Sequence, residues 1–402
     1  MNNVKSDFPI LDKKIRDKTI TYLDSAASTQ KPKQVIHSIS EFLENSYENV
    51  HRGMNSLSID ATDLYEKSRE VAKSFINANS TNEIIFTRGA TDSINIIANS
   101  LAEHLNKGDK IVVTELEHHS NYLPWMHLCK KLELELKIIP ISKEGILSED
   151  EIINNCDDTT KVLSLTHMSN VTGQILDIKK IKQEINKDIY VAVDGCQSIA
   201  HLNIDVKDLN CDFYSFSSHK LYGPSGIGIM FGKEDILNQL NPPTLGGGMI
   251  NEVSSNDFSY AMLPNKFEPG TPSIEAAIGF KAAMEYLNNI NYQDYFSKEK
   301  KLRSTLISAL NDFEEIEIYG SNKNGNATSI VSFNIKNQNF NDIATFLDQY
   351  GIMIRGGHHC CQPFMKKLGI PGSCRVSFGI YNDINDIDHF VDSMKKTLKL
   401  LQ

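Results

Sequence analysis

Seven short apolar runs alternate with helical stretches between residues 83 and 231 of this 402-residue chain. Continuous apolar runs of this length, separated by helices, are typical of a mostly parallel sheet that is covered on both faces. The pattern predicts an α/β large domain built on a seven-stranded sheet and extending over residues 20–275. The runs lie at 83–87, 110–114, 135–141, 161–166, 190–194, 211–216 and 226–231.

A smaller α+β domain is expected from residues 276–402 together with residues 1–19. The segments 329–334 and 375–378 alternate like strands, and the apolar spacing from Ile387 to Leu398 predicts a terminal amphipathic helix. The stripe of apolar residues from Val35 to Leu43, in a helix that starts near Pro32, is interpreted as core packing. The polar segment after Gly246 to Gly248 is expected to be a flexible loop.

Lys220 is the first candidate for covalent chemistry. It follows a predicted strand and precedes a glycine-punctuated segment that ends at Gly228. This is the placement of a lysine that forms a Schiff base with a cofactor aldehyde. A surface lysine in a loop is the alternative, and only the neighbouring motifs favour the first interpretation.

Asp194 closes an apolar run that starts at Tyr190, so a buried parallel strand would deliver its carboxylate to the ligand-binding edge of the sheet. The Asp194 carboxylate could pair with a protonated pyridine nitrogen or cap a strand end, and this segment alone favours neither interpretation.

Gly89, Ala90 and Thr91 open a predicted helix after another strand. This turn suits a phosphate, although an ordinary helix cap has the same sequence.

His118 and His119 form a pair in the segment Glu117 to Asn121. Adjacent residues on an extended chain point in opposite directions, and no cysteine or carboxylate pattern completes a set of zinc ligands. Stacking of one imidazole on a pyridine ring fits this segment better than a metal site, and no metal is predicted.

The chain resembles the SufS-type (group II) cysteine desulfurases of the class V aminotransferase family, which are fold-type I pyridoxal phosphate enzymes. The resemblance covers nearly the whole sequence, and several independent motifs occur in the expected order. It implies pyridoxal 5'-phosphate as cofactor, L-cysteine as substrate and a homodimer. The motifs are Tyr22 to Ala27, Asn49 to Gly53, Glu117 to His119, Phe216 to Pro224, Phe267 to Pro272 and Arg355 to Cys360.

The resemblance also implies a role for each matching residue. Lys220 would hold the cofactor aldehyde and then move the substrate Cα proton, while His118 would stack on the ring. Asp194 would bind the pyridine nitrogen, and Gln197 the phenolic oxygen. The phosphate would be held by Ala90, Thr91, Ser217, His219 and, across the dimer, Thr271, and the substrate would be bound by Asn170, Arg355 and Arg375, since a guanidinium suits a carboxylate.

Cys360 is the expected nucleophile. A desulfurase needs a thiolate that attacks the sulfur of bound cysteine, and Arg355 and two histidines would favour the charged form. The alternative is an inert buried cysteine. Cys361 stands where the family has alanine, which leaves open whether Cys361 is the nucleophile, accepts sulfur or forms a vicinal disulfide. A metal site in this run is a weaker interpretation, because four consecutive residues do not easily face one ion.

Bulk properties narrow the remaining functions. The net charge of −10 argues against nonspecific nucleic-acid binding. Seven cysteines without CxxC spacing suit a reducing compartment. The chain shows no apolar core of a signal peptide and no apolar span, so we expect a cytoplasmic protein without a membrane partner.

The Cys360 loop is short, which suggests that a SufE- or SufU-type acceptor collects the sulfur for iron–sulfur cluster assembly. Selenocysteine lyase activity, another class V reaction or a non-catalytic scaffold are the alternatives.

Overall fold

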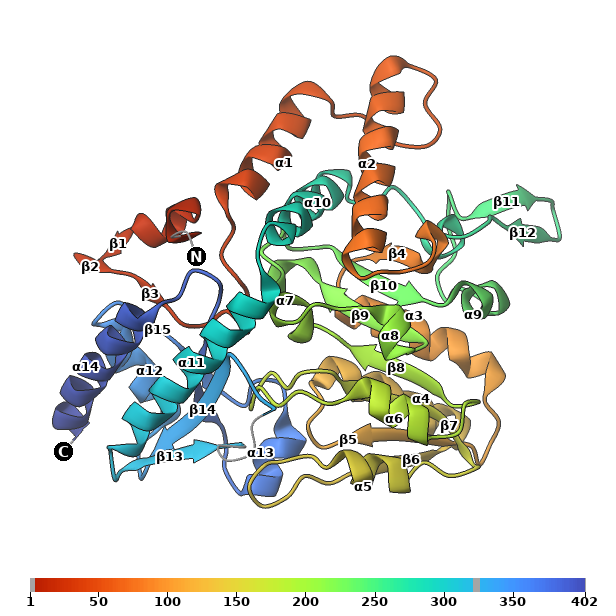
Figure 1. The fold of residues 1–402 in the computed structure, drawn as a ribbon. Helices are drawn as coiled ribbons and strands as arrows, with labels where there is room; N and C mark the ends of the chain where they lie inside the picture. The colour runs from red at the N-terminus through yellow and green to blue at the C-terminus, as the bar shows by residue number, and fades with distance from the viewer. Residues whose placement is uncertain (1–3, 321–325, 402) are drawn as a thin grey trace.

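The computed structural model describes residues 4–320 and 326–401, and its centre is a seven-stranded sheet (Figure 1). The strand order is β4-β10-β9-β8-β7-β5-β6. Neighbouring strands are parallel except at β10, which is antiparallel to β4 and β9. The predicted, mostly parallel seven-stranded sheet is therefore confirmed. Its strands are β4 (Ile84–Thr87), β5 (Lys110–Thr114), β6 (Glu135–Ile139), β7 (Thr160–Thr166), β8 (Tyr190–Asp194), β9 (Phe213–Ser217) and β10 (Gly228–Gly232).

Successive side chains of these strands enter two different cores. Ile85 and Met230 pack with α3 (Ala90–Leu101) on one face, whereas Ile84 and Ile229 belong to the core on the other face. Strand side chains alternate between faces, and here both faces are covered, which is why the strands read as continuous apolar runs. The other helices of this part are α1 (Lys33–Asn45), α2 (Ser56–Phe75), α4 (Leu123–Leu132), α5 (Glu149–Asn154), α6 (Ile178–Glu184), α7 (Ser198–His201), α8 (Val206–Leu209), α9 (Glu234–Gln239) and α10 (Ile274–Asn288).

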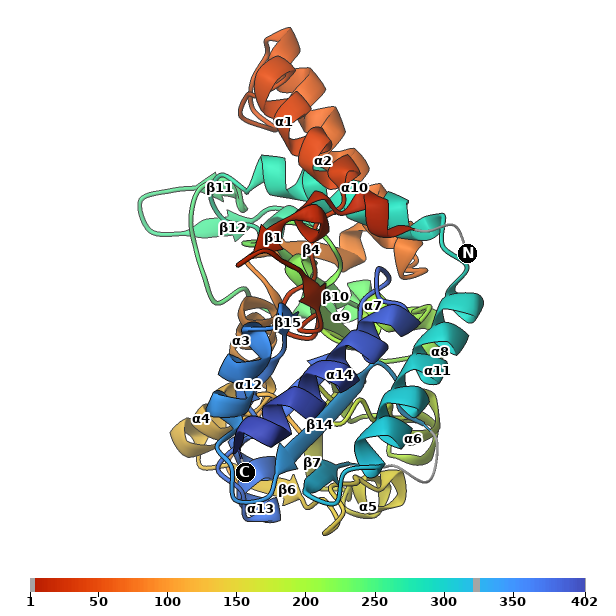
Figure 2. The same cartoon turned by 90° about the vertical axis from the view of Figure 1, so that its left-hand side faces the viewer.

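A second sheet of four antiparallel strands has the order β13-β14-β17-β16. Helices α11, α12 and α14 lie along it (Figure 2) and share its apolar core, in which Leu306, Phe333 and Phe390 are buried. The elements are α11 (Tyr292–Asn311), β13 (Ile316–Tyr319), β14 (Ile330–Ile335), α12 (Phe340–Asp348), β16 (Arg355–Gly357), α13 (Gln362–Leu368), β17 (Ser373–Ser377) and α14 (Ile384–Leu401).

The N-terminal segment connects the two parts. It contains the short pair β1 (Lys14–Ile15) and β2 (Lys18–Thr19), followed by β3 (Thr21–Tyr22), which pairs in parallel with β15 (Ile352–Met353). The division at residues 20 and 275 stays a prediction. Residues 1–3, 321–325 and 402, which were assigned to the smaller domain, lie outside the described residues.

Two local expectations were wrong. The segment predicted as a flexible loop is a hairpin of β11 (Ile250–Val253) and β12 (Phe258–Tyr260), closed by a hydrogen bond from Ser254 N–H to the Asp257 carbonyl at 2.8 Å. The apolar stripe of α1 is only partly core, because Ile36 and Leu43 are 45% and 49% exposed. The reason is that α1 projects from the body beside α2 and α10 (Figure 1) and offers a single face to α10.

Candidate active site

A cavity of about 330 Å³ collects nearly all of the predicted site residues from both sheets. Thr271 is the exception: it lines a separate cavity of about 370 Å³, together with Arg88 and Glu268. The predicted residues that line the first cavity are Ala90, Thr91, His118, Asn170, Asp194, Gln197, Ser217, His219, Lys220, Arg355, Cys360 and Arg375.

Asp194 and Lys220 reach this cavity from neighbouring parallel strands. Asp194 is the last residue of β8 and is buried, and its Oδ1 accepts the Cys196 N–H at 2.9 Å. Lys220 ends a short turn that follows β9. Within residues 4–320 and 326–401, its Nζ has no hydrogen-bond or ion-pair partner. Because the amine is unpartnered and half-buried, it is available for a ligand in the cavity.

The start of α3 forms a ring of small polar groups on one side of the cavity. The Ala90 N–H donates to Ser217 Oγ at 2.9 Å, and the Thr91 and Ser120 hydroxyls lie 2.7 Å apart. Gly89, with φ of 149°, permits this approach, since a Cβ there would lie 3.2 Å from Ser217 Oγ. Free N–H groups at the start of a twelve-residue helix favour an anion.

His118 and His219 are neutral imidazoles at neutral pH. Burial and the charge of Lys220 lower the pKa of His118 to about 3 and that of His219 to about 4. His118 Nδ1 accepts the Ser120 N–H at 3.1 Å, and His219 Nδ1 lies 3.3 Å from Ser28 Oγ. Two uncharged rings thus face the cavity, one able to stack on a flat ligand and the other able to share a hydrogen bond.

The turn that carries His118 is held by a buried polar network. Glu117 accepts hydrogen bonds from the Thr114 hydroxyl at 2.7 Å and from Asn121 Nδ2 at 2.6 Å. The Ser164 hydroxyl in turn donates to Asn121 Oδ1 at 2.7 Å. Burial raises the pKa of Glu117 to about 8. The network fixes where the His118 ring enters the cavity.

The amide side chains of Gln197 and Asn170 each donate one hydrogen bond to a main-chain carbonyl. Gln197 Nε2 donates to the Ala26 carbonyl at 2.9 Å, and Asn170 Nδ2 donates to the His359 carbonyl at 2.8 Å. The first bond brings the Ala26 segment over the cavity. The second fastens the loop that carries Cys360.

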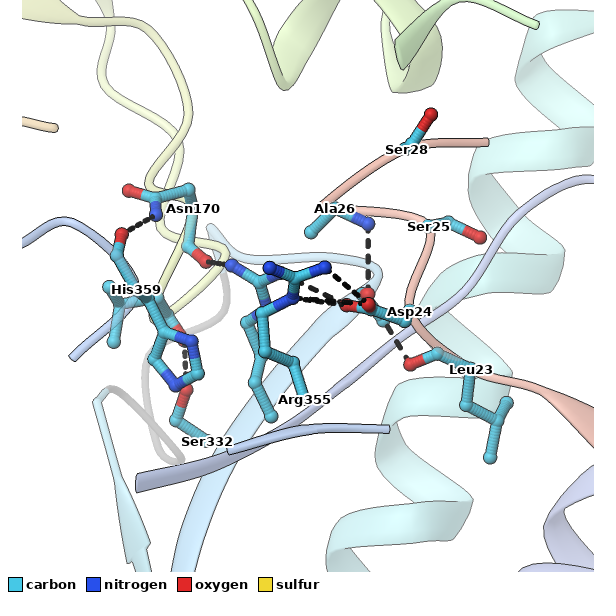
Figure 3. Close-up of polar contacts among 12 residues, drawn as sticks. Leu23, Asp24, Ser25, Ala26, Ser28, Asn170, Ser332, Arg355 and His359 are labelled. Carbon is cyan, nitrogen blue, oxygen red and sulfur yellow. Dashed lines mark hydrogen bonds and ion pairs between the residues drawn. The ribbon is translucent and has the colours of Figure 1, made fainter. Parts of the chain in front are cut away.

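Arg355 and Arg375 are direct partners across the antiparallel strands β16 and β17. Asp24 forms ion pairs with both, at 2.9 and 3.2 Å, and Figure 3 shows the carboxylate beside the Arg355 guanidinium. Burial is the main cause that lowers the pKa of Arg375. Asp24 was not among the predicted site residues. Its place in the motif Tyr22 to Ala27 is the one sequence signal that could have indicated it.

The Cys360 loop is fastened on several sides. The His119 N–H donates to the Cys360 carbonyl at 2.7 Å, and the Cys360 N–H donates to His358 Nδ1 at 3.0 Å. His359 and Cys360 have φ angles of 52° and 53°, in the left-handed region that non-glycine residues rarely occupy. The strained backbone is thus held in place while Cys360 lines the cavity.

Cys361 has a different environment from Cys360. It is fully buried, does not line the cavity, and its Sγ donates to the Glu115 carbonyl at 3.7 Å. Burial raises the pKa of its thiol well above the usual range. All seven cysteines, Cys360 and Cys361 included, are free thiols, so the structure contains no vicinal disulfide.

Between residues 4–320 and 326–401, no group of three or more His, Cys, Asp or Glu side chains is arranged to hold a metal ion. In the same ranges, no helix combines the length and the apolar character needed to cross a bilayer.

This chain is similar to known proteins over most of its length. The family model for class-V aminotransferases matches residues 21–390. A probable cysteine desulfurase of Staphylococcus aureus is 43% identical over 399 residues, which cover 99% of this chain and 96% of that protein.

Solved structures are similar over almost the entire length. The apo cysteine desulfurase of Thermococcus onnurineus NA1 superposes with a TM-score of 0.94 at 35% identity and covers 98% of this chain and 97% of its own. The cysteine desulfurase CsdA of Escherichia coli, in an S-sulfonic acid form, gives 0.90 at 33% identity, with 98% of each chain covered.

Proposed function

The chain belongs to the class-V aminotransferase family and, within it, to the cysteine desulfurases, and we propose on that basis that it converts L-cysteine to L-alanine with pyridoxal 5'-phosphate and leaves the sulfur on Cys360. One observation carries the proposal: the Lys220 amine, which has no partner among the described residues, and the half-buried Cys360 thiol line the same cavity. The other class V reactions do not require a thiol at this place.

The cavity fits the cofactor. The start of α3 and the Ser217 hydroxyl offer donors for a phosphate, and the buried Asp194 carboxylate would face a protonated ring nitrogen. The neutral His118 ring would lie against the face of the pyridine, and Gln197 would reach its phenolic oxygen. When bound, the cofactor supplies an aldehyde for the substrate amine and a ring that draws electrons from the substrate.

Each residue then has a defined task. The Lys220 amine takes the proton from the substrate Cα, and Arg375 holds the substrate carboxylate; its buried Nε has no partner among the described residues. Cys360 attacks the substrate sulfur as a thiolate, forming a new S–S bond while the Cβ–S bond breaks. L-cysteine and one thiol become L-alanine and one persulfide, so the reaction needs no oxidant or reductant.

The direct test is incubation with L-cysteine, followed by assays of alanine and of sulfide released by a thiol reductant. Equal amounts of both products are expected. Lys220→Ala should form neither product, and the Cys360→Ala variant should not form a persulfide. Sulfide accompanied by pyruvate and ammonia, with no alanine, would indicate elimination instead of desulfuration. Assays of alanine and selenide with L-selenocysteine measure the lyase alternative.

We also propose that the protein is of the SufS type and passes its sulfur to a SufE- or SufU-type acceptor for iron–sulfur cluster assembly. The support is the short, fastened loop: with the Cys360 carbonyl bound to the His119 N–H, the thiol has little freedom to travel. An acceptor protein should therefore raise the turnover number. Equal turnover with and without such a protein would contradict this part.

A homodimer would bring Thr271 to a second cavity. Glu268, three residues earlier, is ion-paired with Arg69 at 2.6 Å, which fixes the Thr271 loop away from the cavity of its own chain. Exposed apolar side chains such as Met54 and Met262, 98% and 83% exposed, are consistent with a covered face.

Mixed dimers test this arrangement. A mixture of Lys220→Ala and Thr271→Ala subunits creates one intact site if Thr271 serves the partner subunit. Activity above the mean of the two separate variants is then expected. No recovery, in a sample shown by mass to contain mixed dimers, would contradict the shared site.

We further propose that the protein is located in the cytoplasm. Its free thiols, Cys360 above all, require a reducing compartment.

A further inference from the structure

Asp24 connects the two arginines of the substrate side of the cavity. Its carboxylate accepts from Arg355 Nε at 3.1 Å and from Arg355 Nη2 at 2.9 Å, and also from Arg375 Nη2 at 3.2 Å. In Figure 3, several of the dashed lines end at the Asp24 carboxylate. The Asp24 side chain is 12% exposed and that of Arg375 is 3% exposed, whereas that of Arg355 is 50% exposed.

The strand register makes such an acid necessary. Arg355 and Arg375 are directly opposite on β16 and β17, and like charges at directly opposite positions destabilise a sheet. Asp24 lies on the same side of β17 as β16, next to the Arg355 end of that strand, and forms a parallel bridge with Ser377. On its other side, Ser377 pairs with Ile330 of β14. The N–H groups of Leu23 and Ser25 donate to the Met353 and Ser377 carbonyls at 2.8 and 3.3 Å, so the Asp24 backbone is fixed on both sides.

The contacts of Asp24 leave part of each guanidinium available. Asp24 takes Nε and Nη2 of Arg355, and no described residue binds its Nη1. Arg375 Nη1 donates to the Asn170 carbonyl at 2.9 Å, and its Nε is buried without a partner in the described chain. Asp24 therefore orients the guanidiniums and does not occupy every donor that faces the cavity.

Charge balance is the second reason to expect an acid beside these two arginines. Two guanidiniums and one carboxylate leave one net positive charge beside the cavity, which a single substrate carboxylate would neutralise. Without Asp24, Arg355 would be repelled by its cross-strand neighbour, and its half-exposed side chain would turn toward water. The loss of orientation would outweigh the added positive charge, because a bidentate contact depends on the geometry of the donors.

We propose that Asp24 is a positioning residue that holds Arg355 and Arg375 to receive the single α-carboxylate of the substrate. This inference rests on the proposed function, because it takes an amino acid bound in this cavity as the ligand. Cysteine turnover by the unsubstituted protein tests that function separately, so failure of one does not imply failure of the other.

The test compares two ligands that differ in the carboxylate alone. In a Cys360→Ser background, which removes the thiol that accepts sulfur, L-cysteine and cysteamine are titrated into the cofactor-loaded protein and the dissociation constants are read from the absorbance change. Asp24→Asn should raise the constant for L-cysteine by about tenfold or more and leave that for cysteamine within about twofold. Asp24→Glu, which keeps the charge and moves the carboxylate, should show the same selective loss.

Asp386→Asn is the matched control. Like Asp24, Asp386 is a buried acid; it is ion-paired with Lys5 at 2.8 Å and does not line the cavity. It should lower the melting temperature without changing the ratio of the two constants. An equal loss for both ligands in Asp24→Asn would indicate a purely structural role, and unchanged or tighter L-cysteine binding would show that Asp24 does not position the arginines. Either result overturns the proposal.

Discussion

The main-chain N–H of His119 donates to the carbonyl of Cys360 at 2.7 Å, so the turn that carries His118 and the loop that carries Cys360 are joined directly. The two segments are 241 residues apart in the sequence and come from different sheets. Their hydrogen bond fixes the position of the Cys360 backbone at the cavity wall. This fixed position supports the proposal that the Cys360 thiol acts on a ligand in the cavity and that an acceptor protein comes to the thiol.

The adjacent thiols should behave differently. Cys360→Ala is expected to bind L-cysteine but form no persulfide, because Cys361 is buried and its Sγ bonds to the Glu115 carbonyl. Cys361→Ala should keep most of its activity. Alkylation of the persulfide and peptide mass spectrometry locate the sulfur. Sulfur mainly on Cys361, or full turnover by Cys360→Ala, would refute the assignment of the nucleophile.

Lys220→Ala should lose covalent attachment of the cofactor. Lys220 Nζ has no partner in residues 4–320 and 326–401 and lines the cavity with Asp194. Borohydride reduction followed by denaturation should leave the cofactor on the peptide that contains Lys220 in the unsubstituted protein, and on no peptide in the variant. Lys31→Ala is a suitable control, since that amine donates to the Thr29 and His219 carbonyls at 2.6 and 3.0 Å. A borohydride-fixed adduct in Lys220→Ala would disprove the role.

Arg375→Ala should weaken L-cysteine binding and leave the cofactor bound. Loss of a buried guanidinium that pairs with a carboxylate costs about 2 to 5 kcal/mol, which is a factor of about 30 or more in affinity. Binding is measured by titration, and bound cofactor by its absorbance after gel filtration. Arg16→Ala, at an exposed ion pair, should change neither quantity. The assignment fails if cysteine affinity is unchanged or if cofactor is lost first.

Stability should fall as the pH is lowered from 7 to 5, partly through buried histidines. Burial lowers the pKa of His167 to about 4 from the ordinary 6.5. As the pH falls through 6.5, the unfolded chain takes up the proton first, and the stability that His167 contributes above 6.5 is lost toward pH 4. The slope is up to about 1.4 kcal/mol per pH unit for one such group.

The variant His167→Gln should therefore show a smaller drop in melting temperature between pH 7 and pH 5 than the unsubstituted protein. His104→Gln, at an exposed position, should follow the unsubstituted protein. Parallel pH profiles for all three proteins would rule out the contribution of His167.

The sequence by itself determined the fold class and indicated the residues that we propose as chemically active. Runs such as Tyr190 to Asp194 are apolar throughout because both faces of the strand are covered, and this local pattern survives without knowledge of the neighbouring strands. Lys220 and Cys360 could be predicted as candidates from the sequence, because each lies in a motif of residues close in sequence, and both line the same cavity. These motifs do not depend on contacts between distant segments.

Only the tertiary structure decided how the distant segments meet. The cross-strand placement of Arg355 and Arg375, and the position of Asp24 against both, follow from pairings among β16, β17 and the segment after β3. The exposed stripe of α1 and the hairpin after Gly248 depended in the same way on where other elements lie. Burial and charge balance are properties of the assembled neighbourhood, and a side chain separated by more than 300 residues leaves no local pattern that would reveal its partner.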